Sequence, residues 1–284
     1  MKRLTNGFKR MWFREHPESE NIKVPFTPEM ALVALVLLEV RVDLLEIEKD
    51  RIFTAMVVGI AFLLRKSEHI GNKIGTAPPL RKKDVVFFDR DDRVIPYHLV
   101  GGTTRAERVA INIKFSKADQ TGLGRINSHV RQTDEAKFCV VRVLEKWIYD
   151  TRVFYGAKEG DLLYHLKIRG AEKFDIDLLH EVMTETTDSM IQDRSKKRVV
   201  NEEMKRVTSH SLRYGGAVAM AAAGLPEYFI SLYGGWKEGS PTVKHYIRMA
   251  SLEVSRVSGA MAVAATSLPS SNFIRRFVIQ KKTK

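Results

Sequence analysis

The chain has 284 residues, of which 44% are hydrophobic, so it is long and apolar enough for one large domain or two small ones with a buried core. This composition excludes an intrinsically disordered chain. Lys and Arg total 47 against 34 Asp and Glu, and the formal net charge of +13 favours a polyanionic partner such as nucleic acid.

Residues 1–26 are basic and irregular, and we expect them to form a leader or linker ahead of a domain over residues 27–284. The opening residues lack the apolar core of a signal peptide. The longest apolar run, residues 31–38, is too short to cross a bilayer. The single cysteine, Cys139, lies in an apolar run and excludes an internal disulfide. These features predict a soluble, intracellular protein without a membrane partner.

The first part of the domain carries helical signals. Thr27 can cap a helix and Pro28 suits its first position, which predicts a helix over residues 28–48. A second helix is predicted over residues 51–66, and its apolar character on nearly all sides indicates burial. Arg65 would lie where this buried helix ends.

Strand signals follow. Residues 85–88 are β-prone, residues 93–96 would return after a turn, and residues 108–115 alternate as a strand does. A turn over residues 116–124 comes next. Further helices are predicted from about residue 134, over 178–191, 209–223 and 225–233, and beyond the Gly234–Gly235 break. The pattern predicts an α+β fold that is mostly helical, with a small antiparallel β-sheet.

Two pairs of polar residues have the spacing of one helical face. His210 and Arg213 lie three positions apart, so an imidazole that accepts a proton and a guanidinium that forks two phosphate oxygens would point the same way. Arg65 and Glu68 have the same spacing, and the carboxylate could orient the guanidinium. Taken alone, His210 and Arg213 are better explained as ordinary surface residues. Arg65 and Glu68 alone are better explained as a local helix ion pair.

Three further residues have chemistry that fits these pairs. Lys117 is predicted at a hairpin tip, where most lysines are merely solvated. Trp236 follows Gly234–Gly235 and offers an aromatic donor. Tyr246 is most simply a core tyrosine, and a nucleophilic role would require activation, because a phenol with a pKa of about 10 is rarely ionised at neutral pH. The eight histidines show no metal-ligand spacing, and we expect no metal and no other cofactor.

The order of these motifs is more informative than any one of them. R-x-x-E, a hairpin Lys, H-x-x-R, G-G-W and Y-I-R follow one another along the chain. This order resembles the tyrosine recombinase (phage integrase) family, and within it the Cre-like members. The resemblance covers residues 27–261 and is most specific over residues 209–248. It implies a tyrosine recombinase catalytic domain over residues 27–284, with residues 1–26 as the remnant of a DNA-clamp region.

The resemblance implies two roles at the scissile phosphate. Arg65 and Arg213 would be the arginines that clamp it. Glu68 would be the acidic partner that orients the site.

It also implies the groups that make and break bonds. Tyr246 would be the nucleophile, and His210 would exchange a proton beside it. Trp236 stands where many relatives have a second histidine, and would donate its indole N–H. Lys117 would protonate the leaving 5′ oxygen, with Lys114 as the alternative.

The implied activity is DNA strand breakage and rejoining by site-specific recombination. It would pass through a covalent 3′-phosphotyrosine intermediate, without metal or ATP. The implied partner is double-stranded DNA, with a homotetramer assembled on it. The implied location is the cytoplasm or nucleoid, or the nucleus, depending on the organism. Residues 271–279 could insert into a neighbouring subunit or pack on their own core. Two alternatives stay open, namely a catalytically reduced DNA-binding protein derived from a mobile-element recombinase, and a type IB topoisomerase-like enzyme.

Overall fold

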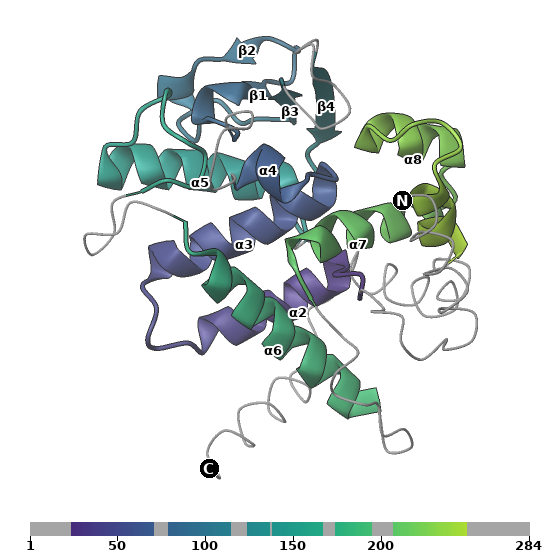
Figure 1. The fold of residues 1–284 in the computed structure, drawn as a ribbon. Coiled ribbons are helices and arrows are strands. Elements are labelled where there is room, and N and C mark those ends of the chain that lie inside the picture. The colour runs from purple at the N-terminus through teal and green to yellow at the C-terminus, as the bar shows by residue number, and fades with distance from the viewer. Residues whose placement is uncertain are drawn as a thin grey trace, which may run out of the picture.

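The computed structural model describes residues 24–70, 79–114, 124–136, 138–166, 174–194 and 207–248, and structural statements concern these residues. The leader up to residue 23, the hairpin tip with Lys117 and the tail over 271–279 lie outside them. Helices make up most of the described chain, and a small antiparallel sheet lies along one side of them (Figure 1). The predicted mostly helical α+β fold is confirmed.

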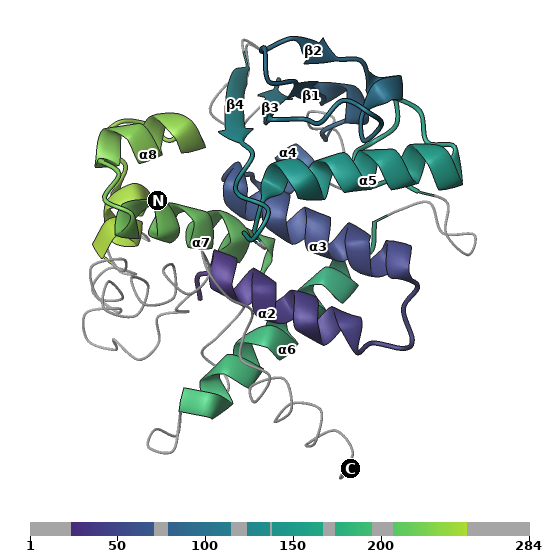
Figure 2. The same cartoon turned by 180° about the vertical axis from the view of Figure 1, so that it is seen from behind.

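The helices lie in layers beneath the sheet (Figures 1 and 2). Helix α5 (Val140–Tyr155) packs against the sheet, and α3 (Glu46–Ala61) packs against α5. Helix α3 also contacts α2 (Pro28–Glu39) and α7 (Ser209–Ala222), and α6 (Ile176–Arg194) packs on α2. None of the described helices combines the length and apolar character needed to cross a bilayer.

Helix α2 begins as its sequence predicts and ends earlier. The Thr27 hydroxyl accepts a hydrogen bond from the Met30 N–H at 3.4 Å, and Pro28 takes the first helical position. The prediction that this helix continues to Glu48 is wrong. Arg41 donates hydrogen bonds to both carboxylate oxygens of Asp43 at 2.8 Å each, and this bidentate pair stabilises a turn after Glu39.

Glu48 begins the next helix rather than ending the first one. Its carboxylate accepts the Leu45 N–H at 2.8 Å, which satisfies a donor that the first turn of α3 leaves open. The predicted second helix over residues 51–66 is therefore shifted, because α3 spans Glu46–Ala61.

The end of α3 is a sharp reversal at Leu63. This residue is fully buried and has a φ of +50°, a left-handed conformation that a leucine rarely adopts. The chain then enters a separate short helix, α4 (Lys66–His69), with Arg65 as its N-cap. Arg65 therefore begins a new helix, whereas the sequence predicted it at the end of the long buried one.

The sheet has the strand order β2-β1-β3-β4. The strands β1 (Val85–Phe88), β2 (Val94–Ile95) and β3 (Arg108–Ile113) confirm the predicted strands to within a few residues. Strand β4 (Arg125–Val130) pairs antiparallel with β3 and completes the predicted hairpin. Its own pattern did not reveal it, because it is an edge strand with few buried positions.

Helix α5 begins at Val140, later than the predicted start near Asp134. The Arg142 side chain donates to the backbone carbonyls of Asp134 and Ala136, so these residues form a turn that is tied to the helix. Cys139 is buried at the start of α5, as its apolar neighbours predict.

Two apolar clusters hold the elements together. The larger one lies around α3 and α5 and extends to the inner face of the sheet. The smaller one joins the Leu63 turn to α7, to α8 (Glu227–Gly234) and to the helical residues 241–248. Tyr246 is a buried member of this smaller cluster, so packing helps to determine where its ring lies.

The contact between α3 and α7 requires glycine at residue 216. A Cβ there would overlap the backbone carbonyl of Ile60. We expect Gly216→Ala to lower the free energy of unfolding by about 1–3 kcal/mol through overpacking. Urea unfolding measures this, with Gly160→Ala as control, because a Cβ at Gly160 meets nothing within 4 Å. Equal stability of the two variants would contradict this packing.

Candidate active site

Arg65 and Glu68 form the first element of the site, at the start of α4. The Glu68 carboxylate accepts the Arg65 backbone N–H at 2.8 Å through one oxygen and the Arg65 Nη1 at 2.7 Å through the other. The Glu68 side chain is buried, with 1% exposed, while that of Arg65 is 22% exposed. The carboxylate therefore orients a guanidinium that still reaches solvent.

Arg213 is the most deeply buried cation of the site, with 1% of the residue exposed. From α7 it donates to the carbonyl of Leu63 through Nη1 and to that of Gly234 at 2.7 Å through Nη2. Its guanidinium carbon lies 3.7 Å from the centroid of the Trp236 ring, in a cation–π contact. The strained Leu63 turn thus presents its carbonyl to a buried cation.

Burial, together with the positive charge of Arg65, lowers the pKa of Arg213 to about 9. Glu68 opposes this effect. A guanidinium that has lost its hydration and faces a second one favours an arriving anion. This local field is what a phosphate group would meet.

The Gly234–Gly235 turn at the end of α8 anchors both arginines. The Gly234 carbonyl accepts from Arg213, and the Gly235 carbonyl accepts from Arg65 Nη2 at 3.4 Å. Gly235 has a φ of +66°, which favours glycine, and a Cβ at Gly234 would overlap the Trp236 ring. The backbone of the G-G-W motif therefore holds the two guanidinium groups close to Trp236.

His210 and Tyr246 face each other across the smaller apolar cluster. The His210 Nε2 lies 2.9 Å from the Tyr246 hydroxyl oxygen, so the two side chains share a proton. The Tyr246 ring stacks on Tyr214 with 4.3 Å between centroids and meets the edge of Trp236 at 5.8 Å. These contacts place the phenol oxygen beside a base and near the two arginines.

Burial raises the pKa of the Tyr246 phenol above its ordinary value, while the charges of Arg213 and Arg65 act in the opposite direction. A phenol in this setting stays protonated at neutral pH. Removal of its proton by a base would make it a nucleophile, and the His210 Nε2 lies within hydrogen-bond reach of the phenol oxygen.

Arg125 is a site residue that the sequence analysis missed. It is the first residue of β4, and its Nη2 lies 3.4 Å from Glu68, on the oxygen that also accepts the Arg65 backbone N–H. Burial lowers its pKa, with Arg65 also lowering it and Glu68 opposing. The signal available in the sequence was its place directly after Gly124, where the predicted hairpin returns.

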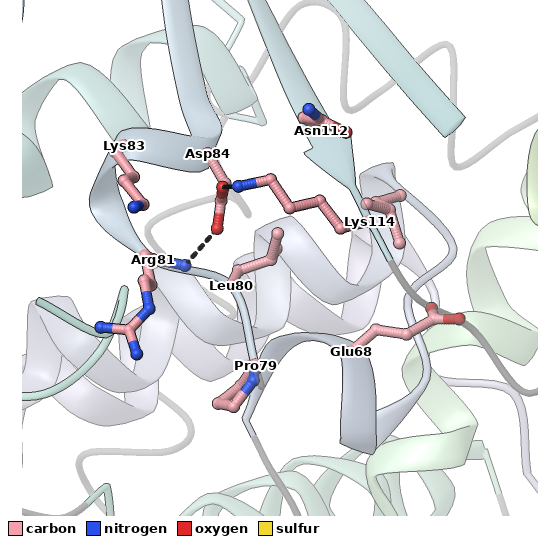
Figure 3. Close-up of a pocket in the computed structure, with 9 residues that line it drawn as sticks. Glu68, Pro79, Leu80, Arg81, Lys83, Asp84, Asn112 and Lys114 are labelled. Carbon is pink, nitrogen blue, oxygen red and sulfur yellow. Dashed lines mark hydrogen bonds and ion pairs between the residues drawn. The ribbon is translucent and has the colours of Figure 1, made fainter. Parts of the chain in front are cut away.

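Of the two candidate hairpin lysines, Lys114 lies among the described residues and Lys117 does not. Lys114 directs its ammonium group to Asp84 at 2.6 Å, and Figure 3 shows it crossing the pocket away from the Glu68 carboxylate. Lys114 is thus held in a salt bridge, and Lys117 lies outside the described residues. Of the other predicted site residues, the structure brings together Arg65, Glu68, His210, Arg213, Trp236 and Tyr246.

Solved structures of recombinases and integrases match the chain, whereas no protein-family model and no curated protein does. The chain is similar to the XerH site-specific recombinase bound to palindromic difH substrate, with 14% identity and a TM-score of 0.49 over 83% of this chain and 52% of that one. It is similar to the Tn1549 transposon integrase in complex with circular intermediate DNA, with 17% identity and a TM-score of 0.44 over 83% of this chain and 64% of that one.

A third structure, of the XerA recombinase, has 15% identity and a TM-score of 0.39 over 94% of this chain and 66% of that one. The chain thus spans about half to two thirds of the length of these proteins. With identities of this size, function rests on the residues of the site itself.

The two backbone carbonyls that accept hydrogen bonds from Arg213 allow a prediction about stability. Arg213→Lys keeps the charge, but one ammonium group cannot reach both the Leu63 and Gly234 carbonyls. We expect the free energy of unfolding to fall by about 1–3 kcal/mol, since a buried acceptor loses its donor. Urea unfolding checks this, with the exposed Arg105→Lys as control. A loss no larger than that of the control would contradict the anchoring role.

Proposed function

We propose that residues 27–284 form the catalytic domain of a tyrosine-type site-specific DNA recombinase. The observation that carries the proposal is the 2.9 Å contact between His210 and Tyr246, beside the buried Arg213. A proton acceptor, a phenol and a desolvated cation at one point are the parts required to attack a phosphodiester.

In the proposed reaction the Tyr246 oxygen attacks the scissile phosphorus and its proton passes to His210. A 3′-phosphotyrosine bond forms while the bond from phosphorus to the 5′ oxygen breaks. Lys117 supplies the proton that the leaving 5′ oxygen takes. The 5′ hydroxyl of another strand then attacks the phosphotyrosine and regenerates the phenol. The energy of the broken bond is kept in the intermediate, so rejoining requires no ATP.

Charge stabilisation is the chief role of the arginines in this scheme. The pentavalent transition state carries one more negative charge than the diester, and Arg65 and Arg213 are already oriented by Glu68, Leu63 and Gly234. Preorganised charge of this kind in a buried site is commonly the largest catalytic contribution. Trp236 supports it by stacking on Arg213, and in the proposal its indole N–H donates to the phosphate.

The proposed partner is double-stranded DNA, and the formal charge of +13 supports it through phosphate neutralisation. We propose a homotetramer as the active assembly, with residues 271–279 as the segment exchanged between subunits. Sedimentation with and without DNA tests the assembly. A protein that binds DNA without ever forming a covalent adduct would instead be a catalytically reduced DNA-binding protein.

The nucleophile is tested by covalent capture. The protein is incubated with a pool of nicked duplexes of random sequence and denatured, and protein–DNA adducts are separated on a gel. We expect Tyr246→Phe to abolish the adduct, because the ring still packs but has no oxygen to bond phosphorus. Tyr228→Phe, which removes a hydroxyl from an exposed tyrosine, should retain it. An adduct that persists in Tyr246→Phe would assign the nucleophile elsewhere.

The source of positive charge is tested by chelation. Arginines and a lysine supply it in the proposed mechanism, so adduct formation should proceed at an unchanged rate in EDTA and without ATP. The rate of adduct formation is measured before and after dialysis against EDTA. Loss of the adduct in EDTA, with recovery on adding a divalent cation, would contradict this mechanism.

Released products separate recombination from simple relaxation. A supercoiled plasmid carrying two copies of a captured sequence should yield rearranged circles if the domain recombines DNA. Relaxed circles without rearrangement would favour the type IB topoisomerase alternative.

A further inference from the structure

Arg125 is a buried cation whose hydrogen-bonding capacity is only partly used. Its side chain is 17% exposed, and its Nη2 holds Glu68 at 3.4 Å. Its Nε atom is buried and has no hydrogen-bond partner among the described residues. A buried guanidinium with an unused donor is costly unless a further acceptor completes it.

The backbone makes room for this guanidinium. A Cβ at Gly235 would lie 2.7 Å from the Arg125 Nη1, so a side chain there would displace it. The same glycine presents its carbonyl to Arg65. Arg125 therefore reaches the corner at which Arg65 and Arg213 meet the Gly234–Gly235 turn.

The corner has an excess of positive charge. One carboxylate, Glu68, faces the guanidinium groups of Arg65 and Arg125, and Arg213 lies close enough that both of these lower its pKa. Three positive charges against one negative leave a net charge of +2. A phosphodiester brings a single negative charge, and its pentavalent transition state brings two, so the transition state offsets more of this positive charge than the ground state does.

We propose that Arg125 is a third guanidinium of the phosphate site, a positioning residue that holds Glu68 against Arg65 and adds positive charge where the transition state gains negative charge. This inference rests on the proposed function. The backbone N–H of Arg65 and the Nη2 of Arg125 share one Glu68 oxygen, while the Nη1 of Arg65 takes the other. Removing Arg125 frees Glu68 from β4 and lowers the charge of the corner.

The main test is the single-turnover rate of adduct formation at saturating DNA. Arg125→Gln keeps a polar side chain but removes its charge, and we expect the rate to fall by roughly 10²-fold. DNA affinity should change far less than the rate, because many other phosphate contacts hold the duplex and the ground state carries less charge than the transition state. Arg125→Lys restores a charge and should recover most of the rate. Arg105→Gln is the control, since it removes an equal charge from an exposed pair.

Two outcomes would overturn the proposal. One is a rate in Arg125→Gln within twofold of the wild-type rate. The other is a rate that falls together with thermal stability and is not restored by Arg125→Lys, which would make Arg125 a purely structural link between β4 and α4.

A second measurement does not depend on catalysis. Inorganic phosphate should raise the midpoint of thermal unfolding above its value in chloride at equal ionic strength, because it binds the folded state. Arg125→Gln should lose most of that rise and Arg105→Gln should keep it. An unchanged rise in Arg125→Gln would exclude Arg125 from the anion site. If the wild type forms no adduct while the phosphate effect behaves as expected, the proposed function fails and the anion site stands.

Discussion

The site depends on one constraint, the burial of the Arg213 guanidinium between two backbone carbonyls. Leu63 provides one carbonyl from a left-handed turn after α3, and Gly234 provides the other at the end of α8. These two segments lie far apart in the sequence, and a single cation joins them. The sheet side of the fold enters the same corner through Arg125, and the start of α4 enters it through Arg65.

The electrostatics follow from the partial burial of this corner. In water three guanidinium groups and one carboxylate would interact weakly, whereas burial strengthens each interaction and removes the hydration that competes with a ligand. The lowered pKa of Arg213 reflects this desolvation. The phenol of Tyr246 experiences the same burial, which raises its pKa, and the His210 Nε2 lies within hydrogen-bond reach of its oxygen. In the proposed mechanism, one environment thus favours an anion beside the arginines and keeps the proposed nucleophile protonated before the reaction.

The sequence predicts the components of the site better than its geometry. Spacing of three residues correctly pairs Arg65 with Glu68, and local capping by Thr27 and Pro28 locates the start of α2. The Arg41–Asp43 fork and the Leu63 reversal escape prediction, because they depend on side-chain hydrogen bonds and packing that no periodicity encodes. Arg125 escapes for a related reason, since only tertiary contact brings an edge strand against α4.

The central claim is that the Tyr246 oxygen forms a covalent bond to a DNA phosphate. Peptide mapping of the captured adduct tests this claim most directly. After nuclease and trypsin digestion, residues 245–248 are released as a short peptide between Lys244 and the end of Arg248. Mass spectrometry should find a nucleotide on Tyr246 in this peptide, with a free 5′ hydroxyl on the other strand end. A nucleotide on any other peptide, or a 5′-linked nucleotide, would contradict the account.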